Sequence, residues 1–380
     1  MTGEEPPRVL LLARELGFGG IQRDISKFVR HLPQQNIAPH VACFRPGGVR
    51  WDEIVAAGVP TVHLPITSFK SRSVLSGAAV LKRYIAEHRI DLLHAFDAPT
   101  DLFATSFGRL TGIPVIASNL WLRSMLEIRL QWLLAVTDHL ATGVFVNCEA
   151  VARELVDRWR VPRAKVHVCY NGFEPAEFEP AGRERRPEFA KASLVVGTVA
   201  VLRPEKNLIL LIEAFAHLLE TQPRAILLIV GSGPEKAALV SRASALGIAD
   251  ACVFQEAVAA PAEWFRTIDV FVLSSDSEAF SNALLEAMAC GCCPVGTDVG
   301  GTPELIEHGT RGLLFPVNGT AELVSALGRL ANDPAERIRM GEAAAAFAHQ
   351  RLTVSVATSR LASIYRQVLG RSSEREAVPC

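Results

Sequence analysis

The sequence lacks several features that mark common classes of protein. Among its 380 residues, 39 Lys and Arg nearly balance 40 Asp and Glu, and the formal net charge is −1. A nucleic-acid-binding protein normally carries a basic excess or a basic stripe, so this class is disfavoured. No apolar run reaches the roughly 18 residues that a membrane-spanning helix needs. We therefore expect a globular protein that binds no nucleic acid.

The N-terminus lacks the features of a signal peptide, and the cysteines lack the spacing of a metal site. The opening sequence MTGEEPPRVLLLARELG has no basic region before its short apolar run, which favours a buried strand over a signal peptide. The eight cysteines are scattered except for Cys290, Cys292 and Cys293, and no second Cys or His pair stands at metal-ligand spacing. Buried cysteines are favoured over a zinc site. These features predict a cytoplasmic location and no metal.

What the sequence does contain is a repeated alternation of short apolar runs and helical patterns. The length is typical of two domains. Such alternation is typical of parallel sheets covered by helices on both faces. We therefore expect an α/β protein of two doubly wound, Rossmann-like domains with a cleft between them. The predicted strands are 8–12, 41–44, 61–64, 92–95, 114–117, 143–146, 166–168, 194–199, 225–230, 252–254, 270–273 and 294–297.

A change in composition divides the chain. Residues 171–193 are rich in Pro, Glu and Arg and lack a periodic apolar pattern, which is typical of a linker. We predict an N-terminal domain over 1–180, a linker over 181–192 and a C-terminal domain over 193–351. The last helical pattern, at about 352–370, follows the second sheet, and we expect it to pack back on the N-terminal domain.

The stretch 269–314 concentrates polar residues at the ends of predicted strands. Ser281 or Asn282 is placed to cap a helix, and Gly300-Gly301 turns the chain into a second helix with Thr302 as its cap. Two helix N-termini at one sheet edge would offer unpaired N–H groups to a phosphate.

Two carboxylates complete that stretch. Glu278 lies just before the first of these helices and Glu286 lies inside it. A carboxylate beside a phosphate is unfavourable unless it serves a neutral hydroxyl, and sugar and ribose hydroxyls meet that need. The stretch therefore predicts a nucleotide-sugar site.

Three shorter motifs also follow predicted strands. Arg203-Pro204-Glu205-Lys206-Asn207 carries two cations that could neutralise a diphosphate, although a solvated loop is favoured when the motif is taken alone. Gly17 to Gly20 fits either a tight turn or a loop that approaches a phosphate, and it lacks the full dinucleotide fingerprint. Gly231 and Gly233 fit a ligand loop and a structural turn equally well.

Two features of the first half carry open alternatives. His94 ends an apolar strand, with Asp97 beyond it, and a lone histidine there is more often a core residue than a catalyst. Residues 121–136 form an apolar helical pattern with Arg123, Glu127 and Gln131 on one side. A core helix is the favoured interpretation. Peripheral contact with the inner face of a membrane, aided by basic residues between 70 and 83, is the minority one.

Several motifs in order resemble a known family. Residues 278–286 (EAFSNALLE), 300–306 (GGTPELI), 170–173 (YNGF), 203–207 (RPEKN) and Gly19-Gly20 match the family-4 glycosyltransferases of GT-B fold, the glycosyl transferases group 1. The resemblance covers almost the whole chain. It implies retaining enzymes that use nucleotide-diphosphate sugars without a metal or other cofactor, and the chain has no Asp-x-Asp motif.

The resemblance also implies roles for single residues. Glu286 would hold the ribose hydroxyls, Glu278 would contact hydroxyls of the donor sugar, and Lys206 would bind the diphosphate. We expect the catalytic residues to be Glu278, Lys206, Arg203, His94 and Asp97. We expect the nucleotide sugar to be bound by Gly19, Gly20, Gly231, Gly233, Glu278, Ala279, Phe280, Ser281, Asn282, Glu286, Gly300, Gly301 and Thr302.

The sequence departs from the family pattern at two positions. Val201 stands where an Arg is usual, and Arg203 lies on the same side of an extended segment. Phe96 replaces the second histidine of a His-x-His strand end, with Asp97 as a candidate replacement. These departures bear on donor choice and catalytic strength rather than on the fold.

The sequence is compatible with two functions, one of an enzyme and one of a non-catalytic protein. The first is a retaining glycosyltransferase that moves a hexose-type sugar from a UDP- or GDP-sugar to a polysaccharide, oligosaccharide or lipid-linked acceptor in cell-envelope or exopolysaccharide synthesis. The alternative is a non-catalytic GT-B protein that binds a nucleotide sugar or scaffolds an assembly complex, and Val201 and Phe96 are its support. The retained glutamate pair and Lys206 favour the enzyme, and they disfavour an epimerase or phosphorylase.

Overall fold

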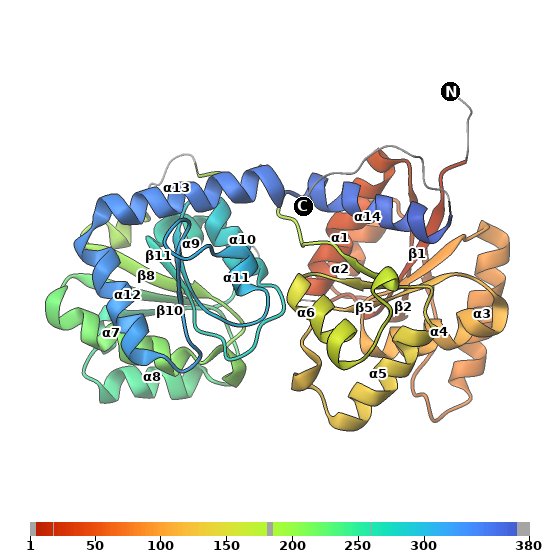
Figure 1. Ribbon diagram of the computed structural model, residues 1–380, viewed down its shortest axis with the longest axis horizontal. Helices are drawn as coiled ribbons and strands as arrows, with labels where there is room; N and C mark the ends of the chain where they lie inside the picture. Colours follow the sequence, from red (N-terminus) through yellow and green to blue (C-terminus); the bar gives the residue numbers. More distant parts are fainter. Residues whose placement is uncertain (1–4, 18, 181–184, 259, 371–380) are drawn as a thin grey trace. The chain divides into compact units, whose positions relative to one another are not determined.

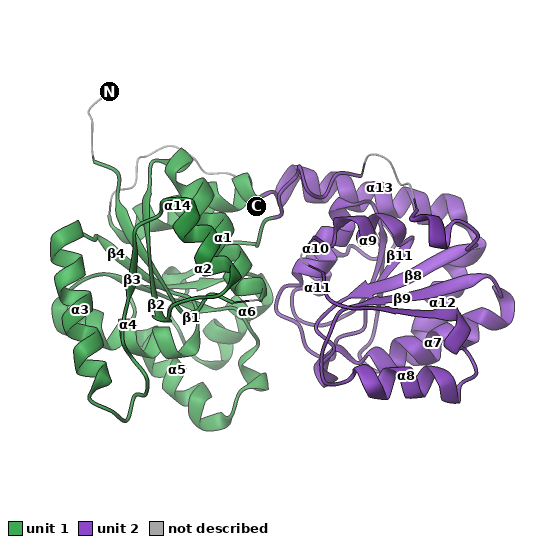
Figure 2. Cartoon of the chain, turned by 180° about the vertical axis from the view of Figure 1, so that it is seen from behind, with its two compact units in different colours: residues 1–172, 354–380 green, residues 173–353 purple. Residues whose placement is uncertain are grey.

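The chain folds into two compact units in this computed structural model, which describes residues 5–17, 19–180, 185–258 and 260–370. Unit 1 comprises 1–172 and 354–380, and unit 2 comprises 173–353 (Figure 2). The boundary precedes the predicted linker because Phe173 and Phe178 are buried in unit 2, where Phe178 packs on Phe265. Linker residues 181–184 lie outside the described residues, and the rest of the predicted linker belongs to unit 2.

Unit 1 is built on a parallel sheet (Figure 1). Its strand order within the described residues is β3-β2-β1-β4-β5-β6-β7. Successive strands are added on one side from β1 to β3 and on the other side from β4 to β7, so the order reverses between β1 and β4. That order is the doubly wound, Rossmann-like arrangement predicted from the alternation of elements. The strands are β1 (Arg8–Glu15), β2 (Ala38–Arg45), β3 (Thr61–His63), β4 (Leu92–Ala95), β5 (Val115–Asn119), β6 (Gly143–Val146) and β7 (Val166–Val168).

Helices cover both faces of this sheet because β1 is apolar on both sides. Val9 and Leu11 pack towards the helices α1, α2 and α14, whereas Leu10 and Leu12 pack towards α3 and α4. The C-terminal helix α14 packs against α1, within unit 1. The helices are α1 (Gly20–His31), α2 (Val49–Ala56), α3 (Ser73–His88), α4 (Ala98–Thr111), α5 (Ile128–Leu140), α6 (Glu149–Arg153) and α14 (Val354–Val368).

Unit 2 repeats the same plan with its own sheet, in the order β10-β9-β8-β11-β12-β13. All of its strand pairs are parallel. The strands are β8 (Leu194–Val199), β9 (Ala225–Val230), β10 (Cys252–Gln255), β11 (Val270–Leu273), β12 (Cys293–Thr297) and β13 (Leu313–Phe315). The helices are α7 (Leu208–Thr221), α8 (Lys236–Ala245), α9 (Ala262–Thr267), α10 (Asn282–Ala289), α11 (Thr302–Leu305), α12 (Thr320–Asn332) and α13 (Pro334–Arg351).

One predicted helix is displaced along the chain. The pattern over 121–136 predicted a helix from Trp121, but α5 begins at Ile128 and runs to Leu140. A short 3-10 turn, Arg123–Met125, precedes it. The helix starts late because the Arg123 side chain turns into the interior of unit 1, where it is fully buried.

Candidate functional site

Most of the residues predicted to bind the donor lie at or near one edge of the unit 2 sheet. The strand order reverses between β8 and β11, and the loops that follow these two strands, 200–207 and 274–281, leave the sheet at its carboxyl edge. In doubly wound sheets ligands bind at such a reversal point, because the connections on either side of it run to opposite faces. The topology therefore brings together loops that are about seventy residues apart in sequence.

An ion pair joins the two loops. The Nζ atom of Lys206 lies 2.6 Å from Oε2 of Glu278, and the Oγ atom of Ser275 donates to the same oxygen at 3.3 Å. The two charged side chains are 22% and 13% exposed, so a bound ligand can still reach them. The sequence predicted Lys206 as a cation for a diphosphate and Glu278 as a carboxylate for sugar hydroxyls. The structure places these two side chains in direct contact with each other.

The loop around Lys206 is held by residues to which the sequence analysis gave no role of their own. The Oγ atom of Ser274 donates to the Lys206 carbonyl at 2.9 Å. The Asn207 amide donates to Asp276 at 2.8 Å and to Asn318 at 3.1 Å, which ties together the loops after β8, β11 and β13. Asn207 adopts a left-handed conformation with φ 45°, which asparagine tolerates better than most residues. The position of Asn207 directly before α7 was the available signal.

The segment 279–286 forms the start of helix α10 and is largely buried. Ser281 is its N-cap, and its Oγ accepts from the Leu284 N–H at 3.2 Å; Asn282 is the first helical residue. Ala279 and Phe280 are buried beside it. Glu286 lies on the second turn and is only 3% exposed. This helix start is therefore rigid and capped by the first of its two predicted candidates.

The glycine turn after β12 adjoins the loop after β11. The Gly301 N–H donates to the Ala279 carbonyl at 2.9 Å, and Gly300 has a positive φ of 55°. The predicted second helix is only the one-turn α11, and its N-cap is Gly301 rather than Thr302. Thr302 is the first helical residue, and its buried Oγ1 has no hydrogen-bond partner among the described residues, so it does not cap the helix.

Gly231 and Gly233 lie at the start of the loop after β9. A Cβ atom on Gly231 would lie 1.8 Å from the Ala200 carbonyl oxygen, and one on Gly233 would lie 2.4 Å from that of Leu202. Leu202 N–H donates to the Ser232 carbonyl at 3.0 Å in the same region. Close backbone approach thus explains both glycines, and it supports the structural alternative. Their predicted contact with the nucleotide sugar stays a prediction.

Arg203 and Val201 both point away from the interior of unit 2. The Arg203 side chain is 60% exposed and lies 3.8 Å from Glu205, a distance typical of a weak surface pair. Val201 is 51% exposed. Arg203 is therefore accessible to an anion, and its role as a substitute for the usual arginine stays a prediction.

His94 in unit 1 lies in the core. It is fully buried, its Nδ1 is 2.7 Å from the Tyr365 hydroxyl and its Nε2 is 3.0 Å from Oγ of Ser118. Burial lowers the pKa of His94 to about 3. Phe96, also buried, stacks on the imidazole with ring centroids 4.0 Å apart. Both ring nitrogens are engaged, so this arrangement argues against the predicted catalytic role and for the core alternative.

The other predicted residues of unit 1 lie at helix starts. Asp97 caps α4, and it accepts from the Thr100 N–H at 3.0 Å and from the Arg14 N–H at 2.6 Å. Burial raises the pKa of Asp97. These bonds give Asp97 a structural role that the prediction of catalysis did not foresee. Gly19 is the N-cap of α1 and Gly20 its first residue, while Phe18 between the loop glycines lies outside the described residues.

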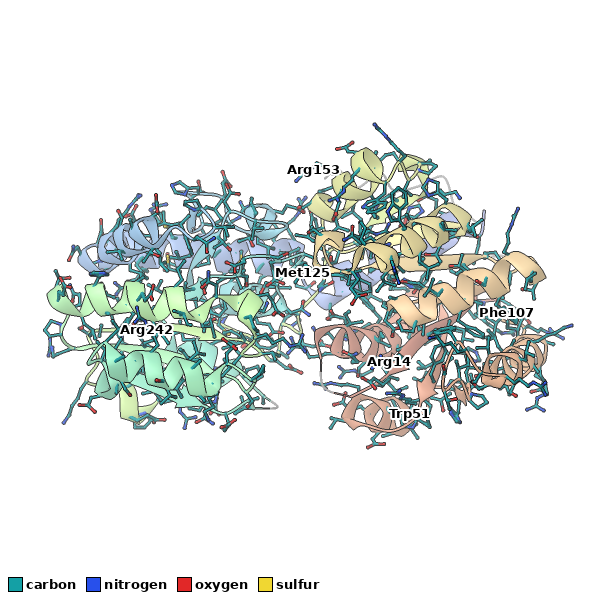
Figure 3. All side chains as sticks on the ribbon, turned by 90° about the horizontal axis from the view of Figure 1, so that it is seen from below. Arg14, Trp51, Phe107, Met125, Arg153 and Arg242 are labelled. Carbon is teal, nitrogen blue, oxygen red and sulfur yellow. The ribbon has the colours of Figure 1, made fainter. Side chains whose placement is uncertain are left out.

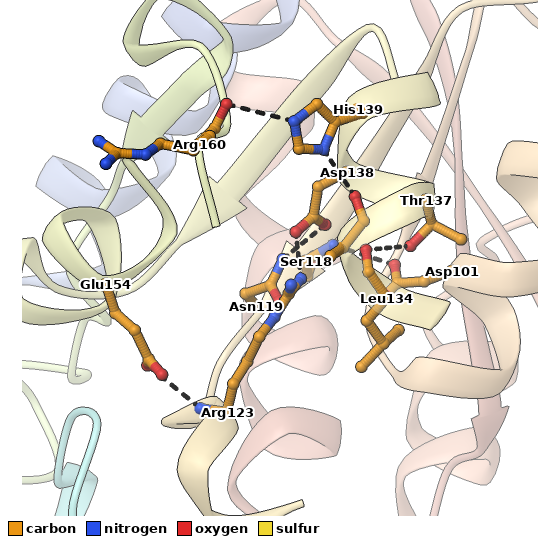
Figure 4. Close-up of polar contacts among 11 residues, drawn as sticks. Asp101, Ser118, Asn119, Arg123, Leu134, Thr137, Asp138, His139, Glu154 and Arg160 are labelled. Carbon is orange, nitrogen blue, oxygen red and sulfur yellow. Dashed lines mark hydrogen bonds and ion pairs between the residues drawn. The ribbon is translucent and has the colours of Figure 1, made fainter. Parts of the chain in front are cut away.

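A buried polar cluster in unit 1 escaped the sequence interpretation (Figure 4). Arg123 forms an ion pair with Asp138 of α5, and Asn119 bonds to both side chains. Nearby, Asp101 accepts from the Ser118 N–H at 3.0 Å, and burial raises the pKa of Asp101 well above its usual range. The available signal for this pairing was an Arg and an Asp in a segment rich in apolar residues.

The part of the chain that the structure describes has no cluster of metal ligands and no membrane-spanning helix. It contains no group of three or more His, Cys, Asp or Glu side chains placed to hold a metal. Cys290, Cys292 and Cys293 are buried in unit 2, and Cys380 lies outside the described residues. No described helix is long and apolar enough to cross a membrane.

Comparison with known proteins finds two family matches that together cover most of the chain. Residues 183–347 match the family described as glycosyl transferases group 1, and residues 18–177 match Glycosyltransferase Family 4. Among solved structures, Anabaena HepE in complex with UDP and glucose superposes with a TM-score of 0.82 at 20% identity, covering 95% of this chain and all of that chain. Similarity at this identity shows the fold.

Two curated relatives match more closely in sequence. The D-inositol 3-phosphate glycosyltransferase of Kribbella flavida is 34% identical over 220 residues, which are 54% of this chain and 51% of that enzyme. The N-acetyl-alpha-D-glucosaminyl L-malate synthase of Bacillus anthracis is 34% identical over 211 residues, 55% of each chain. The matched segment thus spans about half the length of these relatives.

Proposed function

Because this chain belongs to the family-4 (group 1) glycosyltransferases of GT-B fold, we propose that it is a retaining enzyme of glycan synthesis. It transfers a hexose-type sugar from a UDP- or GDP-sugar to a polysaccharide, oligosaccharide or lipid-linked acceptor. The observation that carries the proposal is the contact of Lys206 with Glu278 at the reversal point of the unit 2 sheet. A diphosphate and a sugar hydroxyl are the two groups that this pair is suited to receive side by side.

Each residue has a distinct task in the proposed reaction. Lys206 neutralises charge that develops on the departing diphosphate, with N–H groups of the Gly300–Thr302 turn as further donors. Glu278 accepts from hydroxyls of the donor sugar, and Glu286 accepts from those of the ribose. The acceptor oxygen bonds to the anomeric carbon on the face from which the diphosphate leaves. As the bond from that carbon to the phosphate oxygen breaks, the leaving phosphate takes the acceptor's proton.

The proposal also covers the setting of the reaction. The residues named need no metal or other cofactor, and the enzyme works in the cytoplasm with peripheral contact at the inner face of a membrane. Both curated relatives carry names of enzymes that glycosylate small acceptors. We therefore include small hydroxylated acceptors beside glycan chains when acceptors are screened.

The proposal is tested by donor turnover. The purified protein is incubated with UDP-glucose, UDP-N-acetylglucosamine, UDP-galactose and GDP-mannose, and release of UDP or GDP is followed with and without candidate acceptors. We expect slow hydrolysis of one donor and faster turnover with its acceptor. Glu286→Ala should weaken nucleotide binding by roughly 10- to 100-fold, since a hydrogen bond to a charged group is lost.

A surface carboxylate provides the matched control. Glu342 is exposed on α13, and Glu342→Ala should leave nucleotide affinity unchanged. Saturable nucleotide-sugar binding without any UDP or GDP release would refute the enzyme and favour the non-catalytic scaffold. That alternative draws on Phe96, which is buried where the family usually places a histidine, and on the exposed Val201.

A further inference from the structure

Helix α5 has the reverse of the polarity expected for a surface helix. Its buried side carries Gln131, Thr137 and Asp138, along with Leu134 and Ala135. Polar residues of a surface helix normally face water and its apolar residues face the core. Here the buried ion pair of Asp138 with Arg123 occupies the inner face (Figure 4). Polar contacts therefore help to hold the helix in place, and most of its large apolar residues are turned outward.

The outward face of α5 is an apolar stripe. Ile128, Trp132, Val136 and Leu140 follow one another at intervals of four residues, and Leu133 lies beside them. Their exposed fractions run from 47% to 64%, with Trp132 the most exposed. From Ile128 to Leu140 the stripe is about 18 Å long at 1.5 Å per residue. Met125, labelled in Figure 3, extends it just before the helix and is 46% exposed.

Cations border this stripe. Residues 158–165 run alongside α5, because Trp159 packs edge-on against Trp132 at 5.3 Å and Lys165 Nζ donates to the carbonyls of His139 and Ala141. Arg158, Arg160 and Arg163 of this segment are exposed, as is Arg129 on the helix.

The balance of charge at this border is basic. Among the acidic residues between 123 and 165 in the described chain, Glu127 and Asp157 are exposed, and the Glu149 side chain, 39% exposed, lies 3.8 Å from Arg163. The border therefore has a basic excess, although the whole chain has a formal charge of −1.

We propose that the outward face of α5 docks on an anionic lipid surface. An apolar stripe with a central Trp, bordered by arginines, matches the interface between acyl chains and anionic headgroups, where Trp and Arg side chains are favoured. The basic border distinguishes this occupant from a second copy of the chain, which would set the same arginines against each other. The proposal rests on the proposed function for its purpose, since a lipid-linked acceptor would be met at this surface.

Vesicle flotation tests the proposal. The full chain is mixed with vesicles of phosphatidylcholine alone or of phosphatidylcholine with about 30% phosphatidylglycerol, which makes the surface anionic. We expect binding to the anionic vesicles that falls as salt is raised. Trp132→Ser should lower the partition coefficient roughly tenfold, and Arg158→Gln about fivefold. Ile128→Ser with Val136→Ser gives a second variant that leaves the Trp132–Trp159 contact intact.

A matched control is available on the same unit. Leu110 of α4 is 88% exposed, and Leu110→Ser should leave vesicle binding unchanged. Quenching of Trp fluorescence by brominated lipid should fall sharply in Trp132→Phe, which locates the contact. Equal flotation of wild type and both stripe variants would overturn the proposal, as would a dimer in sedimentation that the stripe variants abolish.

The two proposals fail in different ways. Donor hydrolysis in the absence of vesicles does not require the α5 face, so Trp132→Ser should retain it. Hydrolysis without vesicle binding would refute docking and leave the proposed enzyme standing. Vesicle binding without hydrolysis of any donor would leave docking standing and refute the enzyme.

Discussion

Replacing Glu278 by Gln should make the protein bind free nucleoside diphosphate more tightly. Lys206 is paired with Glu278 at 2.6 Å, so in the proposed reaction the carboxylate competes with the diphosphate for the same ammonium group. A sugar-bearing donor offers hydroxyls to Glu278 in return, whereas the diphosphate product does not. Glu278 would thus weaken product binding selectively, and Glu278→Gln removes that competition without changing the side chain's size.

The size of the effect follows from the burial of the pair. Exposed ion pairs contribute about 0–1 kcal/mol, and breaking a fully buried one costs about 3–5 kcal/mol. With side chains 22% and 13% exposed, this pair lies between the two classes. A competition of about 1–2 kcal/mol corresponds to roughly 5- to 30-fold tighter binding of UDP or GDP. Binding of the intact donor should gain less, because the hydroxyl contact with the carboxylate is weakened.

Titration calorimetry with the diphosphate and with the intact donor measures both effects. Glu342→Gln removes an exposed carboxylate from α13 and should leave the diphosphate affinity unchanged. Lys206→Ala in the Glu278→Gln background should abolish the gain, which makes the pair a double-mutant cycle. Unchanged or weaker diphosphate binding by Glu278→Gln would refute the competition, whatever the activity of the variant.

Three further predictions concern the scaffold. Gly231→Ala should lower donor affinity and stability, because the added Cβ would lie 1.8 Å from a backbone oxygen of the loop after β8. Gly328→Ala, whose Cβ would have no described atom outside its own helix within 4 Å, should lower neither in the same titration and thermal melt. Asp138→Ala should lower the free energy of unfolding by about 3–5 kcal/mol in urea denaturation, since it leaves a buried arginine unpaired, whereas Asp157→Ala at an exposed site should change it by less than about 0.5 kcal/mol. Burial lowers the pKa of His94 to about 3, so on acidification the unfolded chain takes up a proton at this residue before the folded chain does. The free energy of unfolding should therefore fall as pH drops from about 6.5 towards 3. A smaller fall in His94→Gln would confirm that His94 is the source.

The donor loops were predictable because each is continuous in sequence. Strand β11, a polar loop and the Ser281 cap of α10 follow one another directly, so composition and capping rules apply without knowledge of distant contacts. The contact of Lys206 with Glu278 spans 72 residues, but the doubly wound order sets it by placing β11 beside β8. A local pattern and the strand order therefore explain the contact, which the sequence analysis did not predict because it treated the two residues separately.

His94 shows where such rules stop. Its partner Tyr365 comes from α14, 271 residues away and beyond the whole of unit 2. The sequence predicted that the C-terminal helix packs on the first domain, but no spacing in it indicates that this helix brings Tyr365 to His94. The same holds for Asp97, whose bond to the Arg14 N–H joins the ends of β4 and β1. In both cases the residue type suggested chemistry, and long-range packing assigned the side chain to structure.

Helix α5 exposes a different limit, because periodicity defines two faces of a helix without saying which one turns inward. The usual rule places the apolar face inside, and it is wrong for α5 because Asp138 and Arg123 neutralise each other in the interior. Replacing a buried ion pair with apolar residues is often neutral or stabilising. The stability of unit 1 alone therefore gives no reason to keep charges inside and Trp132 outside. A lipid surface that receives the outer face supplies that reason, since the inner ion pair then holds the apolar stripe in the orientation that docking requires.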